Sequence, residues 1–452
     1  MKMFIVLLRL LKTFFIEMET RINPKVLYIS SASPLEGPGV GAFRHVNMLR
    51  DEGLEVDFLT LNPVDGHPDV LYVNHNRGWM DRLRSVINVK FSKKAESGYF
   101  FFYRKENFPP VSTKKVLNQI RKPYDWVIIW FWQGMLSFET VEAIYDKLHC
   151  VIFFLCADYS PMSGGCHFTG DCDRFSKGCG ECTAFHSKNP YDFSWWNVQY
   201  RKRVYDKVRP VVIGNSYMKK FFFDRSYLLK SVATIAERPF VDTNFFHPLD
   251  VPTLRKKYKI VNEIEFIIAY GAQGVDDPRK GYAYLIEALN LFYKRLSPRE
   301  RSKVLLLVIG KNGDRIKKMI PFNLLSLGYI PFEKLSEFYS LADVFVCPSV
   351  NDAGPSMVGQ SIACGTPVVG FEMGALLDWV KDKGTGYCSA LRDSNSLADN
   401  IQRIYGMSES ERTSLSNHCR KVALSYNLKE KSMEWMDLYY QQKSIDKTKQ
   451  GE

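Results

Sequence analysis

Short apolar runs alternate with helical patterns along the first half of the chain. Lys25–Ser30 is an apolar run typical of a buried parallel strand, and the glycine-rich loop Gly37–Gly41 follows it. The helical pattern Phe43–Glu52 and the strand pattern Glu55–Leu61 come next. This order predicts the βαβ unit of a doubly wound sheet. Further strands are predicted at Asp125–Phe131, Cys150–Leu155 and Val211–Gly214.

The same alternation restarts after Pro248 and Pro252, which interrupt the pattern and mark a domain boundary. We therefore predict an α/β protein with two doubly wound, Rossmann-like domains facing a central cleft, where ligands of such sheets bind. The predicted segments are an N-terminal segment (1–20), two domains (21–245 and 246–425), and a C-terminal helix with a polar tail (426–452). The predicted elements of the second domain are strands Glu265–Tyr270, Val304–Ile309, Val344–Cys347 and Pro367–Gly370, and helices Tyr282–Lys294 and Met357–Cys364.

The composition agrees with two globular domains, and the net charge limits the classes of binding partner. The chain has 452 residues, of which 46% are hydrophobic and 24% charged, as in ordinary globular proteins. The formal charge, 61 − 49 = +12, suits nucleic acid, an anionic membrane surface or phosphate-bearing small molecules. We expect no nucleic-acid partner, because the chain has no zinc-finger pair and no RNA-recognition signature.

The first apolar stretch, Met3–Ile16, is too short and too charged to span a bilayer, since Arg9 and Lys12 interrupt it. Two interpretations stay open: a frayed or upstream helix, and an amphipathic helix that lies on a membrane. No signal-peptide cleavage site follows. We expect a cytoplasmic protein, which in the amphipathic-helix interpretation contacts the inner face of the membrane peripherally.

The segment Asp343–Gly370 carries the most specific pattern in the chain. A buried strand runs into a turn, and a helix starts at a Gly-Pro pair, with Gly354 as cap and Pro355 in the first helical position. Free N–H groups at such a helix start can hold a diphosphate, and Gln360 could reach a ribose hydroxyl. The alternative is a well-capped structural helix. The candidate donor-binding residues here are Asp352, Gly354, Pro355, Ser356, Met357 and Gln360.

Four cysteines, Cys166, Cys172, Cys179 and Cys182, lie close together in the sequence, and the last two form a C-x-x-C pair. Four thiols at this separation suit a structural, tetrahedral zinc ion. The alternative is a set of cytosolic thiols without metal.

Three motifs together resemble retaining glycosyltransferases of family 4, which have the GT-B fold. Asp352, seven residues, Gln360 and a run ending ACGTPVV match the family's donor site, with Asp and Gln in place of two acids. Lys280-Gly281 matches its basic helix start. Ala157–Cys182, with a GGCH and a cysteine cluster, resembles one subgroup of the family, although Ala157 stands where that subgroup usually has His.

The resemblance implies transfer of a sugar, with retention, from a nucleotide diphosphate to a glycan or lipid-linked acceptor in surface polysaccharide synthesis. The N-terminal domain would hold the acceptor, the C-terminal domain would hold the nucleotide sugar, and no catalytic cofactor would be required. Lys280, with Arg279 beside it, would neutralise the leaving diphosphate, while Asp352 would contact the donor sugar. The resemblance also assigns Asp158 to the catalytic site, and places Gly39 and Gly41 where the backbone approaches the donor phosphates or the acceptor.

Two other functions stay open. A sugar-nucleotide epimerase can share this architecture, although paired carboxylates at a convincing spacing are missing. A catalytically degenerate subunit that binds nucleotide or glycan is favoured by Ala157 and Gln360. His167 could supply the absent imidazole or could be a hydrogen-bonded structural residue.

Overall fold

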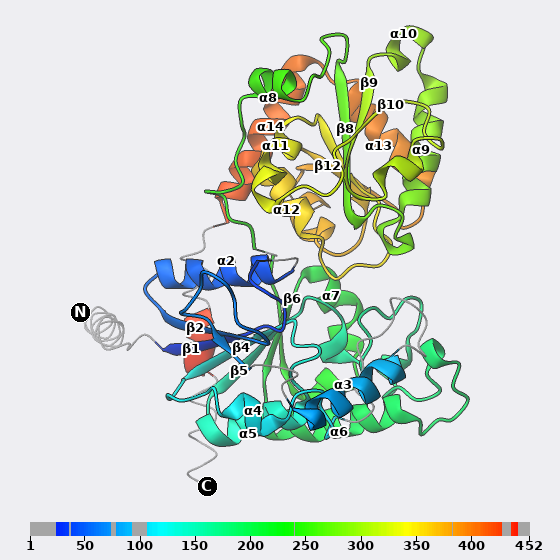
Figure 1. The fold of residues 1–452 in the computed structure, drawn as a ribbon. Coiled ribbons are helices and arrows are strands. Elements are labelled where there is room, and N and C mark those ends of the chain that lie inside the picture. The colour runs from blue at the N-terminus through cyan, green and yellow to red at the C-terminus, as the bar shows by residue number, and fades with distance from the viewer. Residues whose placement is uncertain are drawn as a thin grey trace, which may run out of the picture.

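The computed structural model describes residues 24–35, 38–73, 78–92, 106–238, 240–381, 383–426 and 435–441. These residues form two parallel sheets in two halves, one above the other in Figure 1. The predicted N-terminal segment and most of the polar tail lie outside the described residues. Among the described helices, none is both long and apolar enough to cross a membrane.

The first sheet has seven strands in the order β3-β2-β1-β4-β5-β6-β7. Its central strands are almost completely buried, as expected for strands covered by helices on both faces. The strands are β1 (Lys25–Ile29), β2 (Glu55–Thr60), β3 (Leu71–Tyr72), β4 (Trp126–Trp130), β5 (Val151–Leu155), β6 (Val211–Gly214) and β7 (Ala233–Ala236). The helices of this half are α2 (Pro38–Asp51), α3 (Trp79–Ser92), α4 (Thr113–Leu117), α5 (Phe138–Leu148), α6 (Phe193–Val208) and α7 (Ser216–Phe221).

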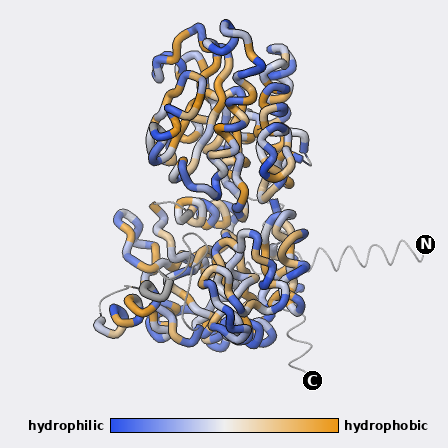
Figure 2. The backbone as a smooth tube through the Cα atoms, turned by 90° about the vertical axis from the view of Figure 1, so that its right-hand side faces the viewer, coloured by the Kyte–Doolittle hydropathy of each residue, from blue (hydrophilic) through white to orange (hydrophobic). Residues whose placement is uncertain are grey.

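Successive side chains of each strand enter different cores, because neighbouring residues point to opposite faces. In β1, Leu27 and Ile29 pack with α5 and α6, whereas Val26 and Tyr28 pack with α2. Figure 1 shows α2 on one side of the sheet and α4, α5 and α6 on the other. Figure 2 shows hydrophobic segments running through the interior of both halves.

The second sheet has six strands in the order β10-β9-β8-β11-β12-β13. Helices α9 and α13 cover one face, and α11, α12 and α14 cover the other. The strands are β8 (Phe266–Gly274), β9 (Val304–Lys311), β10 (Asn323–Ser326), β11 (Val344–Cys347), β12 (Val368–Phe371) and β13 (Gly386–Ser389). The helices are α8 (Val251–Lys257), α9 (Tyr282–Arg295), α10 (Pro298–Arg301), α11 (Leu335–Ser340), α12 (Ser356–Ala363), α13 (Ser394–Tyr405) and α14 (Glu409–Leu424).

The helical segment 435–441 returns from the second half to the first. Trp435 and Tyr439 belong to the core beneath β1 and β4, and the Tyr439 ring stacks on Trp126 with 6.0 Å between centroids. In Figure 1 this segment lies beside the first sheet. The end of the chain therefore helps to build the N-terminal half.

The glycine-rich segment differs from the sequence prediction. The predicted loop Gly37–Gly41 is replaced by helix from Pro38 onward, so Gly39 and Gly41 lie in the first turn of α2. Proline is favoured at a first helical position because it has no N–H to leave unpaired. A Cβ on Gly39 would lie 1.9 Å from the Ser33 carbonyl oxygen, which explains why glycine occupies this position. Gly37 lies outside the described residues.

Candidate active site

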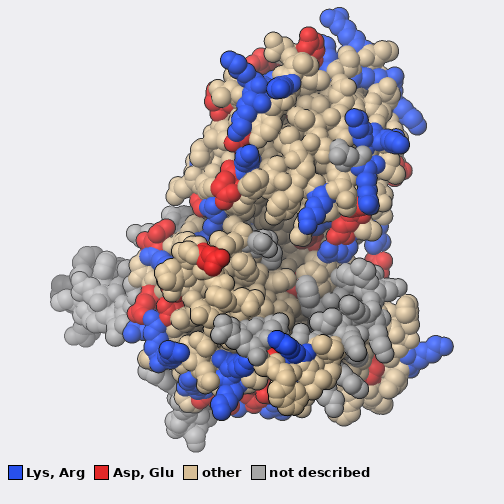
Figure 3. Space-filling model, in the orientation of Figure 1, with Lys and Arg blue, Asp and Glu red and all other residues tan. Residues whose placement is uncertain are grey.

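A cavity of about 300 Å³ lies between the two halves. Its N-terminal wall includes the carboxyl ends of β4, β5 and β6, where parallel sheets bind ligands. Its C-terminal wall includes Gly354, Ser356 and Gln360, three of the residues predicted from the sequence. The segment between the two sheets adds a third wall, formed by Glu237, Arg238, Phe240, Val241 and Asp242. The space-filling view in Figure 3 shows a hollow where the halves meet, with basic and acidic side chains interspersed over both halves.

Lys280 and Asp352 come from different loops and form an ion pair. Lys280 ends a short 3-10 turn, Pro278–Lys280, that follows β8 and is capped by the Asp277 side chain. Gly281 has a φ of 70°, and a Cβ there would lie 1.7 Å from the Pro348 carbonyl oxygen. Only glycine fits this approach, which presses the Lys280 turn against the end of β11. The structure thus brings together the two residues on which the sequence prediction depended most.

The ion pair shifts the pKa of both partners. Burial lowers the pKa of Lys280, but the Asp352 carboxylate raises it by more, and the net pKa lies above its ordinary value. Burial raises the pKa of Asp352, but Lys280 and the Gly354 N–H lower it by more, so that its net pKa lies below its ordinary value. Both groups are therefore charged at neutral pH. A diphosphate that approaches Lys280 competes with the Asp352 carboxylate.

Arg279 faces the N-terminal half. Its guanidinium donates to Asp277 Oδ2 at 2.6 Å and lies 4.4 Å from the ring centroid of Phe168, a residue of the cysteine-rich segment. Its carbonyl accepts a hydrogen bond from the Val350 N–H, which joins the turn to the loop after β11. Arg279 is therefore held beside Lys280 by contacts to both halves.

The cap of α12 lies one residue later than predicted, whereas the helix itself begins one residue before the predicted range Met357–Cys364. Pro355 is the N-cap and Ser356 is the first helical residue, while the Gly354 N–H donates to Asp352 Oδ1 at 3.1 Å. Met357 is partly buried and packs against the second core. Gln360 is 8% exposed, and its Oε1 accepts from the Tyr339 hydroxyl at 2.8 Å. This contact leaves the amide NH₂ of Gln360 as the group that can donate to a ligand.

Asp158 is 1% exposed and belongs to a buried polar network at the end of β5. Its Oδ2 accepts from Gln133 Nε2 at 2.8 Å and lies 3.2 Å from His167 Nδ1. Its Oδ1 accepts from the Ser160 N–H at 2.7 Å. His167 therefore reaches the carboxylate beside Ala157, although it is nine residues away in the chain.

Contacts across the cleft bring Asp158 near the C-terminal loop. The Tyr159 hydroxyl donates to the Asp352 carbonyl at 3.1 Å, and the Asn215 side chain donates to the Ala353 carbonyl. Sequence reasoning missed both contacts, and it also missed the roles of Gln133 and Tyr339. Asn215 follows directly after β6, and Gln133 lies in the turn after β4; this position at the carboxyl ends of strands is the signal that could have identified them.

The two predicted glycines of α2 have different surroundings. Gly41 lines the cavity, and a Cβ there would lie 3.2 Å from the Trp130 ring. Gly39 packs against its own loop at Ser33. The structure therefore brings the α2 backbone to the cavity at Gly41, where glycine allows the Trp130 ring to approach.

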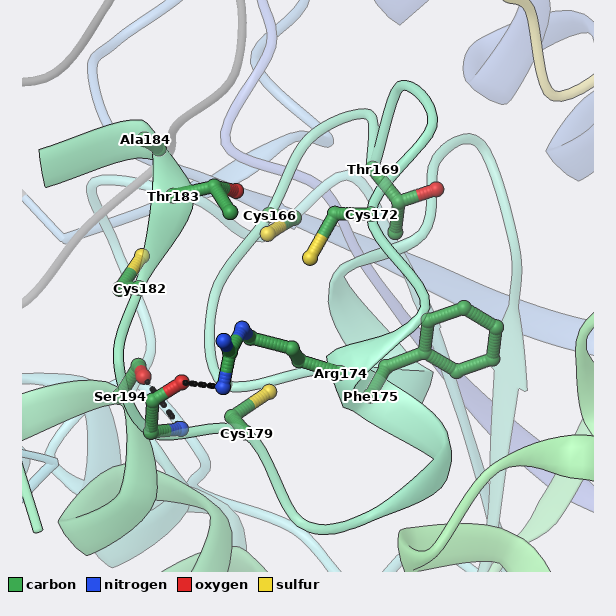
Figure 4. A pocket seen from close by; sticks show the side chains of 12 residues that line it. Cys166, Thr169, Cys172, Arg174, Phe175, Cys179, Cys182, Thr183, Ala184 and Ser194 are labelled. Atoms are coloured by element: carbon green, nitrogen blue, oxygen red, sulfur yellow. Dashed lines mark hydrogen bonds between the residues drawn. The ribbon is translucent and has the colours of Figure 1, made fainter. Parts of the chain in front are cut away.

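The four predicted zinc ligands surround one small cavity of about 20 Å³, drawn in Figure 4 together with Arg174. Burial raises the pKa of Cys166, that of Cys179 to about 12 and that of Cys182 to about 11, so these thiols are protonated at neutral pH. Within the described ranges, no three histidine, cysteine or acidic side chains are placed to hold a metal ion. The sequence therefore identified the cluster, and the zinc ion stays a prediction.

The C-terminal half of the chain matches a model of a known protein family. Residues 250–422 match the family model described as glycosyl transferases group 1. This match includes Lys280, Asp352 and Gln360, but it covers less than half of the chain and leaves out Asp158 and the cysteines. The second half of the chain is thus similar to the glycosyl transferases group 1 domain.

Curated relatives are similar over part of the chain. D-inositol 3-phosphate glycosyltransferase of Actinosynnema mirum is 29% identical over 178 residues, which are 37% of this chain and 42% of the relative. An uncharacterized glycosyltransferase of Methanocaldococcus jannaschii is 26% identical over 131 residues, 28% of this chain and 33% of the relative. The chain therefore spans less than half the length of these curated relatives.

Solved structures are similar over nearly the whole chain. Sucrose-phosphate synthase from Thermosynechococcus elongatus aligns with a TM-score of 0.64 at 17% identity, over 94% of this chain and all of that protein. Anabaena HepE, in complex with UDP and glucose, aligns with a TM-score of 0.60 at 14% identity, over 93% of this chain and all of that protein. The predicted GT-B fold, with two Rossmann-like halves, is confirmed.

Proposed function

We propose that the protein transfers a sugar, as a retaining hexosyltransferase, from a nucleotide diphosphate to a glycan or lipid-linked acceptor. The observation that carries this proposal is the Lys280–Asp352 ion pair beside the start of α12, with the Asp158 network across the cleft. One wall offers a fixed cation and helix N–H groups to an anionic leaving group. The group 1 domain and the complexes of HepE with UDP and glucose agree with this assignment.

The geometry suggests how these residues would act. Lys280 and the α12 start would stabilise the departing diphosphate, and Asp352, released from Lys280, would accept hydrogen bonds from the donor sugar. Asp158 would orient the sugar from the opposite wall through its network with His167 and Gln133. Holding donor and acceptor in register lowers the barrier without a protein nucleophile. A role in surface polysaccharide synthesis, at the inner face of the membrane, completes the proposal.

Thermal unfolding with nucleoside diphosphates and their sugars tests the donor site. At one hundred times its dissociation constant, a ligand of the folded protein adds about 2.7 kcal/mol of stability. We expect one nucleotide to raise the melting temperature and Lys280→Ala to abolish the rise, while Lys311→Ala at the exposed end of β9 leaves it unchanged. The absence of any rise in the unmodified protein would refute the donor site.

A second function is favoured by Ala157 and by the closed Lys280–Asp352 pair: a degenerate subunit that binds nucleotide without transfer. The release of free sugar from the selected nucleotide sugar distinguishes the two functions. Slow hydrolysis without acceptor supports the enzyme, and NMR of the first-formed anomer tests retention. Binding without hydrolysis, and without transfer to any glycan or lipid-linked acceptor offered, supports the degenerate subunit.

We also propose that a zinc ion closes the cysteine cluster when the thiols lose their protons. The clustering of all four cysteines around one cavity supports this proposal. The ion would stabilise the segment that contains His167 and Phe168. His167 contacts Asp158, and Phe168 contacts Arg279. One zinc ion per chain, lost in Cys182→Ser and kept in Cys388→Ser, is the expected metal content. A metal-free protein after expression with added zinc would overturn the proposal.

A further inference from the structure

The wall between the two halves carries an arginine that the predicted site does not use. Arg238 lies just after β7, in the segment that connects the two sheets, and it lines the cavity. Its guanidinium carbon lies 5.0 Å from the ring centroid of Trp379 and 5.4 Å from that of Tyr426. The Tyr426 hydroxyl donates to the Arg238 carbonyl at 2.8 Å. Aromatic contacts from the second half thus hold the guanidinium in place.

The faces of this guanidinium contact aromatic rings, but its N–H groups are not all hydrogen-bonded. Nη1 is buried and has no hydrogen-bond partner among the described residues. Aromatic rings attract a guanidinium through its faces, but they do not replace hydrogen bonds to its N–H groups, which lie in the plane. A buried cationic donor without an acceptor is unfavourable, so this position favours an incoming anion.

The other charged groups of the cavity already have partners. Arg44 donates to Asp242 Oδ2 at 3.1 Å and lies 3.9 Å from the ring centroid of Phe245. Glu237 Oε1 accepts from the Trp435 Nε1–H at 2.7 Å. Among the described residues, the donors left for a ligand include the Arg238 edge, the Gln360 amide NH₂ and the α12 start.

We propose that Arg238 binds a phosphate group of the nucleotide donor in this cavity, as a second cation in addition to Lys280. This inference rests on the proposed function, because it assumes that the cavity holds the donor. Arginine suits the role, since its N–H groups match phosphate oxygens in a fixed, planar arrangement. The aromatic residues around Arg238 reduce the entropy lost on binding, because the side chain is already ordered.

Calorimetric titration tests this inference on the unmodified chain and on Arg238→Gln, Arg238→Lys and Arg315→Gln. Arg315 is the matched control, because its side chain is 71% exposed and pairs with Asp276 on the surface. The ligands are UDP, GDP, ADP and CDP, their nucleosides, and inorganic pyrophosphate. We expect Arg238→Gln to weaken the binding of the preferred nucleoside diphosphate and of pyrophosphate by about tenfold or more. A loss of this size is typical of a lost charged hydrogen bond.

The nucleoside serves as an internal control for folding. Its affinity should change by less than about twofold in Arg238→Gln, because a nucleoside has no phosphate for the guanidinium to bind. Arg238→Lys should lie between Arg238→Gln and the unmodified protein, since a lysine keeps the charge but loses the planar geometry. Arg315→Gln should bind every ligand as the unmodified protein does.

Each other outcome overturns a defined part of the argument. Equal diphosphate affinity in Arg238→Gln and the unmodified protein would refute the role of Arg238 and leave the proposed donor site intact. Loss of pyrophosphate binding alone, with the nucleoside diphosphate unaffected, would assign Arg238 to an acceptor phosphate and refute its contact to the donor. If the unmodified protein binds no diphosphate and no pyrophosphate, both the donor site and this inference fail.

Discussion

The two walls of the cleft use their buried charges differently. Beside the C-terminal wall, Lys280 and Asp352 come from two loops and neutralise each other, so each charge has one principal ionic partner. On the N-terminal wall, Asp158 is embedded among Gln133, Ser160 and His167, and it has less freedom to move. The comparison shows that the C-terminal side pairs two buried charges with each other, whereas the N-terminal side surrounds one carboxylate with several hydrogen-bond partners.

The rigidity of the N-terminal wall originates deeper in the half. Arg201 is 2% exposed and donates to Glu106 Oε1 through Nε at 2.8 Å and Nη2 at 2.6 Å. Its Nη1 donates at 2.6 Å to the carbonyls of Ser160 and Ser163, which lie in the segment after Asp158. This buried pair therefore holds the backbone on which the Asp158 network is built.

The largest effect is expected where the C-terminal wall depends on one glycine. Gly281→Ala should lower the free energy of unfolding by about 5 kcal/mol, because a Cβ would strike the Pro348 carbonyl and φ is positive. Gly328→Ala is the matched control, since its φ is 65° and the surrounding space is open. That control should lose only about 1–2 kcal/mol. Equal losses in urea unfolding would contradict the close-contact argument.

Breaking the buried ion pair Arg201–Glu106, which supports the N-terminal wall, should reduce stability almost as much. Arg201→Met leaves the Glu106 carboxylate buried without its partner, and it should lower the free energy of unfolding by about 3–5 kcal/mol. Arg203, which like Arg201 lies on α6, forms an exposed pair with Glu142 of α5, and Arg203→Met should lose about 1 kcal/mol or less. Denaturant titration compares the two variants. A small loss in Arg201→Met would show that the pair does not hold this wall.

A smaller effect is expected on the pH dependence of the free energy of unfolding, and it depends on His45 in the N-terminal half. His45 is a buried residue at the wall of the cavity, beside Tyr28 and Trp435, and burial lowers its pKa from 6.5 to about 4. Below pH 6.5 the unfolded chain binds a proton that the folded protein refuses. The free energy of unfolding should therefore fall as the pH drops from 6.5 to about 4, by about 3 kcal/mol in total.

The variant His45→Gln tests this prediction, because an amide does not titrate. Between pH 6.5 and pH 4, the free energy of unfolding of this variant should fall less than that of the unmodified protein. The difference between the two losses should be about 3 kcal/mol. Parallel curves for the two proteins would show that His45 does not lower stability in acid. The Lys280–Asp352 pair should contribute little to this interval above pH 5, since the pKa of Asp352 lies below its ordinary value.

The central strands could be predicted because they are continuous apolar runs. Val211–Gly214 and Val344–Cys347 coincide with β6 and β11 at every residue. The strands β3, β7, β10 and β13 were missed, because they are short, partly exposed strands at the ends of the sheet order and lack such a run. Their pairing partners, rather than their own sequences, make them strands.

The site was predictable to the extent that its chemistry lies in local motifs. The spacing of Asp352 and Gln360, and the Lys280-Gly281 pair, identified the C-terminal wall, and both segments lie at the cavity or beside it. The sequence did not reveal that Tyr339 holds Gln360, that His167 reaches Asp158, or that Arg238 stacks on Trp379. These contacts join segments that only the packing of the halves brings together.

The sequence alone determined the repeated strand–helix order, the positions of the central strands and the motifs of the C-terminal wall. These features depend on the periodicity of apolar residues and on the local chemistry of glycine, proline and caps. Tertiary structure decided the ion pair between residues 72 positions apart, the return of Trp435 to the N-terminal core and the shape of the cavity. The physical reason is that charge pairing and burial depend on distance in space, which local sequence patterns do not specify.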